Sequence, residues 1–202
     1  MDTKQIQKQL HDMLDTDLQK RKQLLESGSL FDGYHPEMEQ VHVTNSKRLE
    51  QLINEFGYPT KRKVGVEAAS AAWTIVMHSI SNPPFMKKIL DLLKSPHYID
   101  EIEPRELAYL EDRICTLGRK PQRYGTQFDW DENNLLSPSP IENLQKVNEL
   151  RMALGMSPIE KQTEIMRERA RQEGQKPPGD YHARLTEMED WARKVGWITK
   201  VQ

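Results

Sequence analysis

Apolar residues recur at spacings of three and four along nearly the whole of this 202-residue chain, and strict alternation with polar residues is almost absent. Such spacings place side chains on one face of an α-helix, whereas a half-buried strand requires a period of two. The sequence therefore predicts an all-α fold, a compact bundle of about seven or eight helices. The first helix is expected over residues 3 to 26, with Ile6, Leu10 and Met13 facing inward.

One segment differs from the other predicted helices in being apolar around most of its circumference. Residues 66 to 80 read Val-Glu-Ala-Ala-Ser-Ala-Ala-Trp-Thr-Ile-Val-Met-His-Ser-Ile. A helix of this composition is surrounded by other helices, and its small alanines allow neighbouring backbones to approach closely. Residues 66 to 80 are therefore predicted to be the central helix, and His78 lies on it.

The longest segment without helical periodicity covers residues 119 to 137. Long ordered loops in compact domains often carry function. Residues 124 to 128 have the composition of a short strand, residues 131 to 134 of a turn, and Leu135 could begin a returning strand. The segment is thus predicted to be either a long ordered loop or a short hairpin. After it, residues 139 to 142 and 157 to 160 match the capping box that opens helices.

The domain organisation is inferred from a rise in charge density after residue 160 and from a glycine- and proline-rich break at residues 174 to 179. We expect a helical core domain over residues 1 to 160 and a C-terminal helical extension over residues 161 to 202, docked on the core. The last helix should begin near Asp180 and bury Tyr181, Leu185, Met188, Trp191 and Val195.

Composition argues against several kinds of partner. The 29 basic and 31 acidic side chains give a formal net charge of -2, so no overall field attracts nucleic acid or an anionic membrane surface. No signal-peptide core is present at the N-terminus, and no apolar run has the length of a membrane span. The single cysteine, Cys115, rules out internal disulfides. We therefore expect a cytoplasmic protein with no nucleic-acid or membrane partner.

Several polar side chains interrupt the predicted inward faces, where an unpaired charge would cost several kcal/mol. These residues are Asp17, Arg21, Asn45, His78, Asp112 and Arg113. They are expected to contact one another, and two arrangements are open. The first is an ion-pair network that fixes helix register, with Asp17 and Arg21 paired one helical turn apart. The second is a polar pocket with His78 at its floor and residues 122 to 127 at its rim.

The pocket hypothesis assigns roles to particular side chains. The candidate catalytic residues are His78, Asp112 and Tyr124, and the candidate ligand-binding residues are Asn45, Arg113, Gln122, Gly125, Thr126 and Gln127. His78 would be the acid-base group, held by Asp112 or Asn45. Arg113 prefers a carboxylate or phosphate, which favours a small anionic ligand, for example a nucleotide-like one. In the alternative, Tyr124 packs while Thr126 and Gln127 only hold the loop in place.

Metal and cofactor motifs are incomplete. Glu39 and His42 have the helical spacing of a ligand pair, with His35 one turn earlier, but the second pair that di-metal bundles use is not evident. A calcium loop beginning at Asp129 fails because Asn134 stands where the invariant glycine belongs. Phosphate-loop, zinc-protease and serine-hydrolase motifs are missing as well. The sequence therefore predicts no metal and no cofactor.

A set of residues spread over positions 10 to 160 resembles a known family. They are Asp17 with Arg21, Asn45, Gly57-Tyr58-Pro59, Val64-Gly65, Ala72-Trp73, His78, Ala108-Tyr109-Leu110-Glu111-Asp112-Arg113, Gly118, Gln122, Tyr124-Gly125-Thr126-Gln127, Pro140-Ile141, Arg151 and Gly155. The chain resembles a bacterial helical domain family of unknown function that carries AYLxDR and QxYGTQ motifs. Relatives usually carry tryptophan where this chain has Tyr58, and the tail beyond residue 160 has no counterpart. The resemblance implies a candidate site but no activity.

Two functions remain open from the sequence. The first is an enzyme or sensor that binds a small anionic ligand in a polar cleft. The second is a protein-interaction module of the effector or immunity type, whose polar network is structural. Its partner surface would be the C-terminal helix at residues 180 to 197, around Tyr181, Met188, Trp191 and Trp197.

Overall fold

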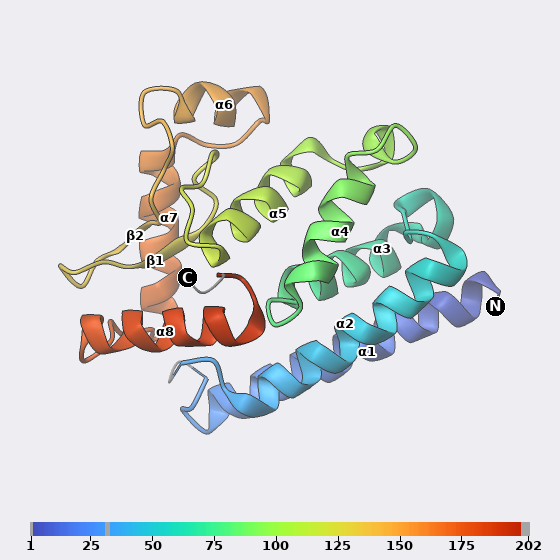
Figure 1. Cartoon of the computed structure of the whole chain (residues 1–202), viewed down its shortest axis with the longest axis horizontal. Helices are drawn as coiled ribbons and strands as arrows, with labels where there is room; N and C mark the ends of the chain where they lie inside the picture. The colour runs from blue at the N-terminus through green and yellow to red at the C-terminus, as the bar shows by residue number, and fades with distance from the viewer. Residues whose placement is uncertain (1, 31–32, 199–202) are drawn as a thin grey trace. The chain divides into compact units, whose positions relative to one another are not determined.

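The computed structural model describes residues 2–30 and 33–198, and in these residues helices predominate. The helices are α1 (Thr3–Glu26), α2 (Pro36–Phe56), α3 (Lys61–His78), α4 (Pro83–Leu93), the 3-10 helix η1 (Ile99–Glu101), α5 (Pro104–Leu117), α6 (Val147–Ala153), α7 (Ile159–Gln172) and α8 (Tyr181–Val195) (Figure 1). The all-α prediction is confirmed. None of the described helices has both the length and the apolar character that crossing a membrane requires.

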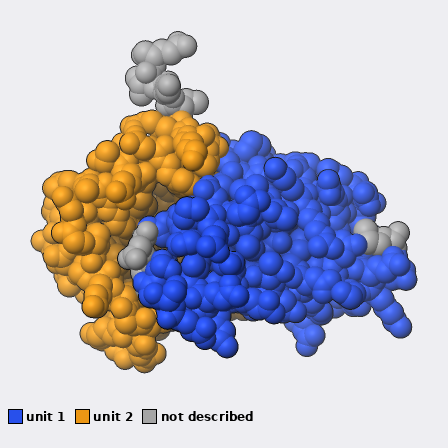
Figure 2. Space-filling view, turned by 90° about the horizontal axis from the view of Figure 1, so that it is seen from below, with its two compact units in different colours: residues 1–102 blue, residues 103–202 orange. Residues whose placement is uncertain are grey.

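Two compact units make up the chain, Met1–Ile102 and Glu103–Gln202, which are called unit 1 and unit 2 and coloured separately in Figure 2. Unit 1 holds α1 to α4 and η1, and unit 2 holds the later elements. The predicted division into a core domain and a C-terminal extension at residue 160 stays a prediction. A compact unit is not necessarily a domain that folds independently, so the two units do not test it. Each unit is described by itself.

In unit 1, α3 is the central helix, as predicted. It contacts α1, α2 and α4, while α1 and α2 pack against each other in antiparallel directions (Figure 1). Its alanines at 68, 69, 71 and 72 are buried, which lets three helices approach it closely. The first helix begins and ends at the predicted residues and buries Ile6, Leu10 and Met13.

The ends of α3 differ from the prediction. The helix begins at Lys61 and bends at Gly65, whose φ of 78° is a conformation that side-chain-bearing residues rarely adopt. Gln7 of α1 donates a hydrogen bond to the carbonyl of Val64 at 2.9 Å, which holds the bend against α1. At its other end the helix stops at His78 rather than at residue 80. His78 therefore occupies the last turn.

Unit 2 contains a small antiparallel hairpin made of β1 (Phe128–Trp130) and β2 (Leu136–Pro138), with Trp130 opposite Leu136. The predicted turn at residues 131 to 134 is present. The first strand begins at Phe128 rather than Tyr124, because the backbone amides of Arg123, Tyr124 and Thr126 donate to the buried carboxylate of Asp112.

The first predicted capping box is wrong. Residues 140 to 142 are extended, since Gln122 donates its backbone amide to Pro140 and accepts that of Glu142, both at 2.8 Å. Helix α6 consequently begins only at Val147. Helix α7 does begin near the second predicted box, but its first amide, that of Ile159, donates to the side chain of Asn148 at 2.8 Å.

Candidate metal centre

Three helices of unit 1 each contribute one titratable side chain to a single cluster. Asp17 lies on the buried stripe of α1 that also contains Leu10 and Met13. His42 lies on the buried stripe of α2, and His78 is the last residue of α3. Because α3 contacts both α1 and α2, the packing of the three helices brings these side chains together.

The two imidazoles face the same oxygen of the carboxylate. Asp17 Oδ2 lies 2.9 Å from His78 Nδ1 and 3.2 Å from His42 Nε2. The two imidazole ring centroids are 4.9 Å apart, and the three potential ligand atoms all lie within 4.8 Å of one another. The side chain of Asp17 is 1% exposed and that of His42 9%, whereas that of His78 is 31% exposed. The cluster is therefore buried on two sides and reaches solvent at His78.

Two buried atoms in the cluster lack hydrogen bonds. Among the residues that the structure describes, neither Asp17 Oδ1 nor His42 Nε2 has a hydrogen-bond partner. The 3.2 Å contact of His42 Nε2 with Asp17 is an ion-pair distance, but its direction does not satisfy a hydrogen bond. Buried polar atoms in folded proteins nearly always have a partner, so two such atoms at one point favour the binding of an additional group there.

Tyr34 fixes the orientation of one imidazole. Its Oη lies 2.7 Å from His42 Nδ1, and the two rings are stacked with centroids 5.7 Å apart. If Nδ1 carries the proton and donates it to Tyr34, the lone pair of Nε2 faces the Asp17 carboxylate. Two electron-rich atoms at 3.2 Å repel each other unless a cation lies between them.

Asp17 is held in its anionic form by the same neighbours. Burial raises the pKa of this carboxyl, but its contacts with His42 and His78 outweigh burial and lower the pKa well below its ordinary value. A carboxylate that stays ionised at neutral pH and below is suited to bind a cation.

The distances suit a first-row transition-metal ion. Zinc binds histidine nitrogen and carboxylate oxygen at about 2.1 Å, and coordination angles of 90–110° then separate ligand atoms by about 3.0–3.4 Å. In the cluster, the 3.2 Å separation of Asp17 Oδ2 from His42 Nε2 falls within that range, and the 2.9 Å separation from His78 Nδ1 lies just below it. Two imidazoles and one carboxylate form a donor set used for zinc and for non-haem iron.

The sequence-predicted residues of unit 1 have different partners from those expected. The partner of His78 is Asp17, and not Asp112 or Asn45. Asn45 is buried on α2 and donates to the carbonyl of Met13 at 2.9 Å, which joins α1 to α2. It thus contributes to the packing that positions Asp17 and His42.

The remaining predicted residues lie together in unit 2, around Asp112. This carboxylate is fully buried, and its two oxygens accept from the amides of Arg123, Tyr124 and Thr126 at 2.8–3.1 Å and from the Thr126 hydroxyl at 3.0 Å. Burial raises the pKa of Asp112, and the hydrogen bonds from these donors oppose that shift. All of the donors point at the carboxylate, so the ionised form is the one that satisfies them.

Two glutamines complete the loop of unit 2. Gln122 donates to the carbonyls of Gln127 and Ser139 and accepts the Gln127 amide, each at 2.8 Å. Arg113 donates to Gln127 Oε1 at 3.1 Å. Gly125 has a φ of 66°, and a side chain there would approach Ile159 within 2.7 Å. These contacts hold the loop in place, while a ligand role for its residues stays a prediction, as does a cavity shared with His78.

Sequence reasoning did not assign Asp17 and His42 to one site. The signal was present in their spacing, because His42 follows Met38 and precedes Asn45 and Leu49 on one buried helical face. His42 was instead paired with Glu39, which is its neighbour on the same helix. The true partners come from other helices, and a local spacing rule cannot find them.

Fold and cluster together define a mainly helical protein of two units with an aspartate-histidine-histidine cluster in the first. The chain belongs to the family of unknown function DUF6624, whose model matches residues 4–172. The matched range includes the cluster of unit 1 and the loop around Asp112, and it ends before α8. It extends through α7, so the expectation that the tail beyond residue 160 has no counterpart is wrong for residues 161–172. No curated protein and no solved structure matches the chain.

Proposed function

We propose that the protein binds one divalent transition-metal ion, zinc or ferrous iron, through Asp17, His42 and His78, and that it is a metal-dependent enzyme acting on a small anionic molecule. The observation that carries the proposal is the convergence of three ligand atoms within 4.8 Å, with Asp17 Oδ1 and His42 Nε2 buried and lacking hydrogen bonds. A metal ion in the cluster would give His42 Nε2 the partner that it lacks.

The number of protein ligands supports a catalytic rather than a structural metal. Structural zinc sites are closed by four protein ligands, whereas catalytic sites use three and keep a position for water or substrate. Here three residues are available, and the partly exposed His78 marks the side from which a further ligand can enter. One carboxylate and two neutral imidazoles leave a divalent ion with a net positive charge, which favours an anion at the open position.

The chemistry that follows is activation of water. A metal bound by three protein ligands lowers the pKa of its water and supplies a hydroxide near neutral pH. Asp17 would be the anionic ligand, His42 the ligand oriented by Tyr34, and His78 the ligand at the solvent side. Hydrolysis of a small anionic substrate is the reaction that this arrangement favours.

Cobalt(II) is the probe of choice for this site, because it replaces zinc and reports its coordination number by visible absorption. Protein freed of metal by a chelator is titrated with Co²⁺, and we expect saturation at one ion per chain with bands typical of four or five ligands. Adding azide should change the spectrum, since the open position is accessible to small anions. Failure to saturate below the millimolar range, or a six-coordinate hydrated spectrum, would overturn the proposal.

Replacing Tyr34 by phenylalanine should weaken metal binding without removing a ligand. The hydroxyl lies 2.7 Å from His42 Nδ1, and loss of such a second partner of a metal-bound histidine costs about 10- to 100-fold in affinity. Competition between Tyr34→Phe and a fluorescent zinc chelator measures the change. Tyr181→Phe, a tyrosine substitution in unit 2, is the matched control and should leave the affinity as in the wild type.

The interaction-module alternative stays a prediction. Its expected surface on α8 includes Met188 and Trp191, and both of these residues line a cavity within unit 2. Their position in the cavity lining accounts for their apolar character without a protein partner.

A further inference from the structure

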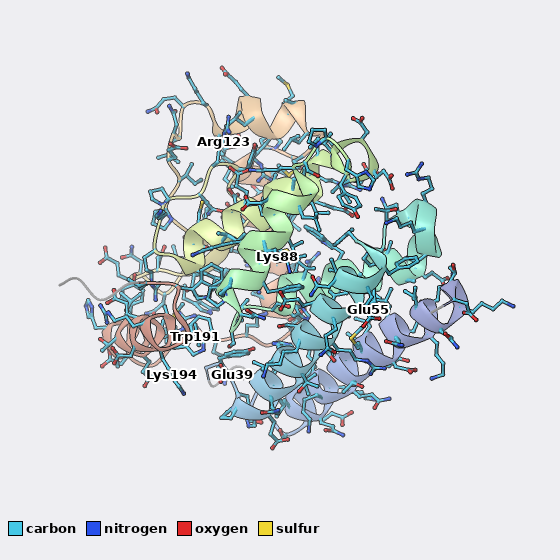
Figure 3. All side chains as sticks on the ribbon, turned by 45° about the vertical axis from the view of Figure 1, so that its right-hand side comes forward. Glu39, Glu55, Lys88, Arg123, Trp191 and Lys194 are labelled. Atoms are coloured by element: carbon cyan, nitrogen blue, oxygen red, sulfur yellow. The ribbon has the colours of Figure 1, made fainter. Side chains whose placement is uncertain are left out.

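A cavity of about 240 Å³ lies within unit 2, between the end of α5, the start of the hairpin and α8. Three arginines, Arg113, Arg119 and Arg184, line it together with one carboxylate, that of Asp129. The lining also includes the apolar side chains of Phe128, Met188 and Trp191, the last of which projects from α8 (Figure 3). The lining thus combines cationic and apolar side chains.

Arg184 can donate a further hydrogen bond. Its Nη2 lies 2.7 Å from Asp129 Oδ1, while its Nη1 is buried and has no acceptor among the residues that the structure describes. A guanidinium group presents its donors as a planar fork suited to two oxygens of one carboxylate or phosphate. An anion in the cavity would supply the acceptor that Nη1 lacks.

Arg119 occupies a backbone position that favours glycine. It has a φ of 57° two residues after the end of α5, where its amide donates to the carbonyl of Thr116 and the next amide donates to that of Cys115, at 3.0 and 2.8 Å. These bonds form the motif that commonly ends a helix with a left-handed glycine. A residue with a side chain is strained in this conformation, and such strain is concentrated at functional sites. The side chain of Arg119 contributes the third guanidinium group of the cavity lining.

We infer that this cavity binds a small organic anion, a phosphate monoester or carboxylate with an apolar body. The arginines would hold the anionic group, and Trp191 and its apolar neighbours would contact the body of the molecule. The volume of about 240 Å³ leaves room for a molecule of about eight water volumes at ~30 Å³ each. The site lies wholly in unit 2 and uses none of the proposed metal ligands.

Phenyl phosphate and benzoate are suitable probes because each combines an anion with an aromatic ring. Tryptophan fluorescence is followed during titration at constant ionic strength with EDTA present, so that the outcome does not depend on the metal proposal. We expect saturation at one molecule per chain for at least one of the two anions, and none for phenol, which is neutral. The fluorescence change should disappear in Trp191→Phe.

Arg119→Gly is the decisive variant, because it removes the guanidinium and relieves the backbone strain together. We expect at least a tenfold loss of affinity for the anion that binds, with a melting temperature equal to or above that of the wild type. Lys120→Ala removes the adjacent exposed cation, which does not line the cavity, and should bind as the wild type does. Absence of saturable binding of both anions, or unchanged binding by Arg119→Gly, would overturn the inference.

Discussion

Asp17→Asn is expected to lower the affinity of the protein for Co²⁺ and Zn²⁺ by at least about 100-fold. Changes to residues that merely support a metal ligand already cost about 10- to 100-fold, and Asp17 is the only carboxylate in the proposed ligand set. The substitution keeps the shape of the side chain but replaces an anionic ligand by a neutral amide. Competition with a chelator of known affinity measures the effect.

A metal-dependent gain in stability gives a second measurement of the same change. A ligand at 100 times its dissociation constant stabilises a folded protein by about 2.7 kcal/mol, so Zn²⁺ should raise the melting temperature of the wild type. Asp17→Asn and His78→Ala should both lose that gain. His78 is partly exposed at the end of α3, so its replacement endangers folding least of the three ligands.

The matched control is Asp15→Asn, which makes the same chemical change at an exposed position two residues earlier on α1. It should bind zinc and gain stability as the wild type does. Equal zinc affinity of Asp17→Asn and Asp15→Asn, with both variants folded by circular dichroism, would be incompatible with the proposed metal centre.

Asp112→Asn is expected to destabilise unit 2 by about 1–3 kcal/mol for each buried donor that it leaves without an acceptor. The carboxylate oxygens accept from three backbone amides and one hydroxyl, and all of these groups are donors. An asparagine amide group would place another donor against them and leave at least one buried amide without an acceptor. Thermal or urea unfolding measures the loss.

Amide hydrogen exchange can show where that loss arises. In the wild type the amides of Arg123, Tyr124 and Thr126 should be protected, and in Asp112→Asn they should exchange faster than the amides of α7. Glu187→Gln, which neutralises an exposed carboxylate on α8, is the control and should change stability by less than about 0.5 kcal/mol. Unchanged stability and protection in Asp112→Asn would mean that the loop does not depend on this carboxylate.

Local sequence patterns predicted the helices far better than they predicted the segments between them. The bounds of helix α1 were predicted closely, because its buried stripe runs along most of the helix. The capping box at residues 139 to 142 led to a wrong prediction of a helix start, because residues 140 to 142 are held extended by backbone hydrogen bonds to Gln122. A local helix-start signal stabilises a conformation less than several hydrogen bonds to a residue far away in the sequence do. Such hydrogen bonds cannot be predicted from the local sequence.

The sequence predicted some of the residues of the candidate site but not the contacts between them. His78 and Asp17 were recognised as polar interruptions of buried faces, which follows from helical spacing alone. Their pairing with each other and with His42 was missed, since residues 17, 42 and 78 lie on three helices. The spacing of residues along one helix cannot fix the rotation and height at which helices meet.

The sequence by itself determined that this protein is helical, which faces of its helices are buried, and which polar side chains lie on those faces, because helix geometry relates residues three and four positions apart. The tertiary structure alone decided that Asp17, His42 and His78 share one point and that Asp112 organises the loop of unit 2. Those contacts depend on how separate segments pack, and packing depends on the shapes of many side chains together rather than on any one local pattern.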